Sequence, residues 1–131
     1  MRALIALALA AACGGQAHPA SPPFDAGKLA AAIDGVMADI EVASRDYDRD
    51  CPRAVHAIEQ IEARAAEPIG ALHAAERDRE RAAELAQAMH GYDTAAAGRS
   101  EVIAMRLAIC WKRHGELHDQ LQHVVDSLPT P

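Results

Sequence analysis

The histidines are the residues whose type and spacing most directly suggest chemistry. The chain contains seven of them, and His114 and His118 stand four positions apart. On one α-helix this spacing puts both imidazoles on the same face, where they can bind one zinc or copper ion, with Asp119 or Glu41 as a further ligand. The competing interpretation is a core histidine at 114, bonded to a facing helix, with His118 at the edge of the core. Without a second ligand cluster, the pattern favours the core histidine.

The first thirteen residues, MRALIALALAAAC, predict export. Arg2 precedes an uncharged apolar run from Ala3 to Ala12. This run of about 10 residues is half the length that a membrane-spanning helix needs. Residues 1–12 therefore have the pattern of a signal peptide rather than an anchor. Residues 13–23 are rich in glycine, proline and small residues, and we expect them to form a flexible linker.

The segment Leu9-Ala10-Ala11-Ala12-Cys13 resembles the lipobox of bacterial lipoproteins. In that family the cysteine becomes the lipidated first residue of the mature protein. Leucine commonly stands three positions before that cysteine, whereas Leu9 lies one position further back. The resemblance implies a lipid anchor on Cys13 and a membrane-anchored protein of the bacterial cell envelope or periplasm. The alternative is a secreted soluble protein, cleaved after an Ala-x-Ala site such as Ala10-Ala11-Ala12.

Two cysteines remain when Cys13 carries lipid. Cys51 and Cys110 are then an even pair in an oxidising compartment, which favours a disulfide between them. Because the loop that it closes is long, the chain-entropy model gives the bond about 4 kcal/mol of stabilisation. The alternatives are two free buried thiols, or a nucleophilic pair of Cys51 with His56, which a disulfide at Cys51 excludes.

Charge and missing motifs exclude other classes of function. The chain has 13 basic and 19 acidic residues, a formal net charge of −6, and no basic cluster, so we expect no nucleic-acid partner. It has no glycine-rich phosphate loop, no Gly-x-Ser-x-Gly elbow and no Cys-x-x-Cys-His haem motif. The sequence therefore predicts a protein that is not an enzyme.

Hydrophobic periodicity predicts helices throughout one domain, residues 24–128. The expected helices cover residues 24–47, 51–67, 68–90 and 100–128. Asp50 is the expected N-cap of the second helix, and Pro68 either kinks that helix or starts the third. Two glycines in residues 91–99 predict a loop, and Ser100 is the expected N-cap of the last helix.

The cysteine pair and Pro68 together favour an all-α, up-down four-helix bundle. At ~1.5 Å per residue, a turn at Pro68 brings Cys51 and Cys110 to similar heights in the bundle. If residues 51–90 formed one helix instead, the two cysteines would lie roughly 30 Å apart, which is too far for a disulfide. The alternative fold is a three-helix bundle whose middle helix is kinked at Pro68.

This expected architecture is similar to that of the four-helix-bundle cytochromes that hold haem b non-covalently. That family binds haem between a methionine on the first helix and a histidine on the last. The resemblance implies a haem site at Met37 and His114, with Trp111 lining it. Alanine supplies roughly a quarter of the chain, and closely packed alanine-rich helices leave little room for a porphyrin. The sequence therefore favours no cofactor, with zinc or copper ahead of haem.

The patterns together predict a small cell-envelope lipoprotein without catalytic activity. Its helical domain is expected to be a structural or interaction module that presents a helical surface to an envelope protein. An alanine-rich apolar seam also fits pairing with a second copy of the chain. The alternative function is a periplasmic four-helix bundle that binds metal or haem through His114 and His118.

Overall fold

The computed structural model describes residues 23–129, apart from the side chains of residues 93–97. Within these residues all regular structure is helical, which confirms the all-α prediction. The α-helices are α1 (Ala26–Ala43), α2 (Cys51–Arg64), α3 (Ala66–Glu76), α4 (Arg79–Met89), α5 (Asp93–Arg113) and α6 (His118–Ser127). Short 3-10 turns are η1 (Ser44–Asp46), η2 (His90–Tyr92) and η3 (Gly115–Leu117). The predicted signal peptide, Cys13 and all of the linker except its last residue lie outside the described residues.

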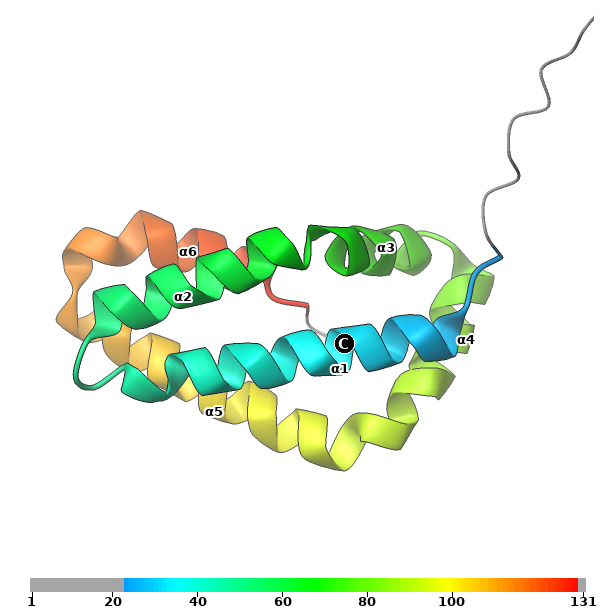
Figure 1. Ribbon diagram of the computed structural model, residues 1–131, viewed down its shortest axis with the longest axis horizontal. Helices are drawn as coiled ribbons and strands as arrows, with labels where there is room; N and C mark the ends of the chain where they lie inside the picture. Colours follow the sequence, from blue (N-terminus) through cyan, green and yellow to red (C-terminus); the bar gives the residue numbers. More distant parts are fainter. Residues whose placement is uncertain (1–22, 130–131) are drawn as a thin grey trace, which may run out of the picture.

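Helix α1 is the central element of the fold. It packs against α2, α3, α4 and α5. Figure 1 shows α2 and α3 running back along α1 nearly in line with each other, while α4 turns the chain at the far end. Helix α5 then returns towards the end where α2 begins, and α6 reverses direction again beside α2. None of the helices in residues 23–129 is both long and apolar enough to cross a membrane.

Aspartate residues cap the N-termini of three of the helices. The carboxylates of Asp25, Asp50 and Asp78 each accept a hydrogen bond from a backbone N–H in the first turn of α1, α2 and α4. Such bonds satisfy donors that have no partner within the helix. The predicted cap at Asp50 is therefore confirmed, whereas the cap at Asp78 divides the helix that was predicted over residues 68–90.

The described residues form six α-helices rather than the predicted four. The predicted start of the second helix at Cys51 is confirmed, whereas the other predicted boundaries are wrong. Helix α2 ends before Pro68, which lies in the first turn of α3, where the missing N–H of proline costs no hydrogen bond. The chain does not reverse there, because α3 continues the direction of α2 (Figure 1). The chain turns after Arg77, where Asp78 caps α4, and α4 crosses the end of the molecule before α5 returns (Figure 1).

The predicted loop at residues 91–99 and the predicted last helix are also corrected. Helix α5 already begins at Asp93, so Ser100 lies inside a helix rather than at its start. The helix predicted to continue to residue 128 ends at Arg113, because His114 leaves the helical region with φ −129° and ψ 70°. Gly115 follows, and glycine costs about 1 kcal/mol inside a helix relative to alanine.

Two apolar clusters share α1. The larger is built from α1, α2, α5 and α6, and it contains Met37, Ile40, Cys51, Val55, Ile58, Ile103, Leu107, Cys110, Leu121 and Val124. The smaller is built from α1, α3 and α4, and it contains Leu29, Ala30, Ile33, Leu72, Ala75, Leu85 and Met89. The two ends of the molecule therefore depend on opposite halves of one helix.

Candidate functional site

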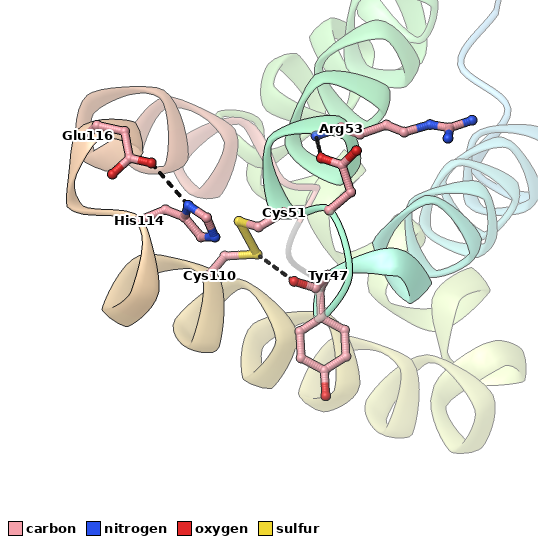
Figure 2. The surroundings of a disulfide bond; sticks show 7 residues. Tyr47, Cys51, Arg53, Cys110, His114 and Glu116 are labelled. Carbon is pink, nitrogen blue, oxygen red and sulfur yellow. Dashed lines mark hydrogen bonds and ion pairs between the residues drawn. A yellow bond between two sulfur atoms is a disulfide. The ribbon is translucent and has the colours of Figure 1, made fainter.

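The disulfide lies at the end of the molecule where α2 begins and α5 ends. Cys51 is the first residue of α2, Cys110 lies in the last turn of α5, and both are buried. They are joined as predicted, with a Cα–Cα distance of 5.7 Å (Figure 2). The backbone carbonyl oxygen of Tyr47 lies 3.7 Å from the sulfur of Cys110. A cysteine held in this bond cannot act as the nucleophile of a pair with His56.

The structure separates the two histidines that were predicted to share a helical face. His114 caps the end of α5, and its Nδ1 lies 3.0 Å from Oε1 of Glu116 (Figure 2). His118 begins α6 on the other side of η3, and its ring packs edge-on against Trp111 with centroids 3.9 Å apart. The i, i+4 geometry on which the metal hypothesis depended is therefore absent.

The other residues of the predicted metal and haem sites have different roles. Met37 is buried in the larger apolar cluster. The carboxylate of Glu41 accepts a hydrogen bond of 3.3 Å from Arg99. Asp119 lies in the first turn of α6, where a negative charge interacts favourably with the helix dipole. In the part of the chain that the structure describes, no group of three or more His, Cys, Asp or Glu side chains is placed to hold a metal ion.

A cleft that the sequence analysis missed lies between α2, α3 and α6. It has a volume of about 530 Å³. Its polar lining residues are Glu59, Glu62, His73, His123 and Ser127, and its walls are Ala63, Ala66, Ile69 and Gly70. Polar residues from three separate helices thus meet in one hollow.

Glu62 is the unusual residue of this cleft. Its relative exposure is 8%, yet its Oε1 atom has no hydrogen-bond partner among the described residues. Burial, and to a smaller extent the negative charge of Glu59, together raise the pKa of this carboxyl to about 7. At neutral pH, Glu62 is therefore divided between its neutral and its charged form.

Two other polar residues of the cleft, Glu59 and His73, are paired with groups other than Glu62. The carboxylate of Glu59 accepts a hydrogen bond of 2.8 Å from the side-chain amide of Gln120 on α6. Its Oε2 also lies 3.7 Å from Nδ1 of His56. His73 lies 3.3 Å from the carboxylate of Glu76. None of these groups donates a hydrogen bond to the Oε1 atom of Glu62.

A second hollow, almost wholly apolar, lies between α5 and α6. It has a volume of about 390 Å³, and its lining residues are Ala104, Leu107, Ala108, Trp111, Lys112, Val125 and Leu128. Val125, one of these lining residues, is 42% exposed. Trp111 lines this groove, and the ring of His118 packs against the ring of Trp111.

Comparisons with known proteins assign no family to this fold. No family model matches the chain, and neither the curated proteins nor the solved structures contain a significant match.

Proposed function

We propose that this chain is an exported lipoprotein of the bacterial cell envelope, held at a membrane by a lipid on Cys13. Its helical domain acts as a structural or interaction module and not as an enzyme. The N-terminal sequence supports the first part of the proposal, because it combines a short apolar run with a cysteine at its end. Residues 13–23 are rich in glycine, proline and small residues, a composition typical of a tether between an anchor and a domain.

The observation that carries the proposal is the pairing of Cys51 with Cys110. The chain has three cysteines, so this bond leaves Cys13 as the single free thiol. A buried disulfide fits an oxidising compartment outside the cytoplasm. It therefore agrees with the export signal while sparing the one cysteine that a lipid would modify.

The apolar groove between α5 and α6 supports an interaction role. Exposed apolar surface rimmed by polar groups is typical of a surface that a partner covers. Trp111 is also the kind of large aromatic side chain that anchors protein interfaces. The groove lies in the half of the molecule where α1, α2, α5 and α6 share one apolar cluster. We propose that this half is a short four-helix bundle that holds the groove in shape.

Metabolic labelling of the full chain, expressed in a bacterium supplied with alkyne-tagged palmitate, tests the proposal. The expected product is a labelled, membrane-associated protein with an oxidised Cys51–Cys110 pair. Replacing Cys13→Ser removes the label, whereas the double variant Cys51→Ser, Cys110→Ser keeps it. In the same cells, a photo-crosslinking residue at Val125 is expected to capture an envelope protein, and one at Val42, which is more exposed but lies outside the groove, is not.

Three outcomes contradict the proposal or a part of it. An unlabelled, soluble protein outside the cytoplasm, cleaved within the first twenty residues, identifies a secreted protein instead. An unprocessed chain with reduced cysteines in the cytoplasm rejects export altogether. Identical crosslinking from Val125 and Val42 rejects the groove as the interaction surface.

A further inference from the structure

The cleft between α2, α3 and α6 is lined by a carboxyl group that has an oxygen atom without a hydrogen-bond donor in the described part of the chain. Glu62 lines this cleft, is more than nine-tenths buried, and has an Oε1 atom without a partner among residues 23–129. Burying a polar group without a hydrogen bond is costly, and burying a charged one is costlier still. A positive charge in the cleft, beside this carboxyl group, would lower the cost, because it favours the ionised form.

The polar residues that line the cleft favour a ligand with a positive charge. Its polar members are two carboxyl groups, two imidazoles and a hydroxyl group, and no Lys or Arg is found among its lining residues. A carboxylate accepts hydrogen bonds and does not donate them. The cleft is therefore suited to a cation, and an anionic group would meet the repulsion of Glu59 and Glu62.

The walls of the cleft select the size and shape of the ligand. Ala63, Ala66 and Gly70 are small residues on one face of the nearly continuous α2 and α3, and Ile69 adds an apolar surface. The volume of about 530 Å³ lies within the range of small-molecule sites, roughly 300–1,000 Å³. The cleft thus has room for a short apolar body beside a charged head group.

A metal ion fits these observations less well than an organic cation. Zinc and copper need three or four ligands at fixed distances, and no group of three His, Cys, Asp or Glu side chains in the described chain is placed to supply them. A guanidinium or ammonium group needs only the carboxyl of Glu62, because its own N–H groups are the donors.

We infer that the cleft binds a small organic cation, whose ammonium or guanidinium group donates to Glu62 and whose short apolar body lies against Ala63, Ala66 and Gly70. His73 on α3 and His123 on α6 both line the cleft, and their imidazole resonances serve as reporters of the ligand. This inference goes beyond the interaction role proposed above and does not depend on lipidation.

A titration of the purified chain with butylguanidinium chloride, followed by NMR, tests the inference. Saturable shifts are expected for the imidazole resonances of His73 and His123. Pentan-1-ol, a neutral molecule of similar size, is expected to give no saturable shift. Because the cation favours the ionised form of Glu62, the dissociation constant is expected to be at least tenfold lower at pH 8 than at pH 5.

Two variants alter the cleft in different ways. Glu62→Gln removes the charge and is expected to weaken binding at least tenfold. Gly70→Leu fills the cleft and leaves the carboxyl in place, with the same expected loss. A Cβ atom at Gly70 meets nothing within 4 Å, so this variant is expected to keep the fold even if Glu62→Gln does not. The matched controls are Glu84→Gln and Gly35→Leu, both at exposed helical positions outside this cleft.

Three results overturn the inference. The first is equal affinity for butylguanidinium in the parent chain and in both cleft variants. The second is equal binding of butylguanidinium and pentan-1-ol, which identifies a purely apolar hollow. The third is stoichiometric binding of Zn²⁺ that requires Glu62, without any binding of the organic cation.

Discussion

Glu62 is a carboxyl group on the inward face of α2, and its burial links the stability of the protein to pH. With its pKa raised to about 7, the folded state keeps a proton that the unfolded chain releases near pH 4.5. Stability therefore falls as the pH rises from about 4.5 to 7, and the penalty is complete above that range. We expect Glu62→Gln to gain stability relative to the parent protein over this window, by about 3 kcal/mol at pH 8.

Urea denaturation of both proteins between pH 4 and pH 8 measures this difference. Glu59, His73 and His123 are present in both chains, so their titration largely cancels in the comparison. Glu84→Gln changes an exposed carboxylate on α4, and it is expected to alter stability by less than about 0.5 kcal/mol at every pH. A difference between parent and Glu62→Gln that does not vary with pH would contradict a raised pKa.

At the residue scale, the sequence predicted the disulfide but not the cleft. Once Cys13 is assigned to a lipid, only one disulfide pairing remains, and Cys51 and Cys110 form it. The position of Glu62 in the sequence does indicate that its side chain points inward. Glu62 stands four residues after the buried Ile58, where the helical period requires an inward side chain. An acidic residue at such a position indicates either a buried ion pair or a binding site. Which of the two it is depends on the side chains of the facing helix α6, which are not known from the sequence of α2.

At the element scale, two arginines attach α5 to α1. Arg99 donates to the carboxylates of Asp34, at 2.7 Å, and Glu41, at 3.3 Å. Arg106 donates to the carbonyl of Glu41 at 3.0 Å and to the hydroxyl of Ser44 at 2.9 Å. Ser44 is 1% exposed and follows the last residue of α1. The hydroxyl of Ser44 itself donates to the carbonyl of Glu41 at 2.8 Å. Arg106 thus adds a charged donor to a pair of polar groups at the end of α1, where the last carbonyls have no backbone partner within the helix.

The variant Arg106→Met keeps most of the length of the side chain and removes these donors. We expect it to lower the free energy of unfolding by about 1–3 kcal/mol, because a buried acceptor and hydroxyl lose a charged partner. Arg113→Met, at an exposed site in the last turn of the same helix, is expected to cost less than about 1 kcal/mol. Equal losses in the two variants, measured by chemical denaturation, would show that the Arg106 contacts contribute little.

The helices themselves were predictable where local signals were strong. The Asp50 cap and Pro52 fixed the start of α2. The break at His114 was not predicted, because apolar residues keep helical spacing through Cys110, Leu117 and Leu121 on both sides of it. Periodicity reports which side chains face the core. It does not report whether one helix or an antiparallel pair presents them, and here α5 and α6 share the larger cluster.

At the scale of the whole molecule, α1 is the element common to both apolar clusters. Its C-terminal half contributes Met37 and Ile40 to the larger cluster, and its N-terminal half contributes Leu29 and Ile33 to the smaller one. The disulfide constrains only the half that contains α2 and α5. A continuous helix through both halves nevertheless couples them, since neither cluster can lose α1 without exposing the apolar residues of the other.

This coupling predicts that loss of the disulfide weakens the distant half as well. The bond joins residues 59 positions apart, and the variant Cys51→Ala, Cys110→Ala is expected to lose about 2–4 kcal/mol of unfolding free energy. Hydrogen exchange measures where that loss falls. If α1 unites the two halves, slow amides in α3 and α4 lose protection together with those in α2 and α5. Unchanged protection in α3 and α4 would instead mean that the two clusters unfold separately and that α1 bends or frays between them.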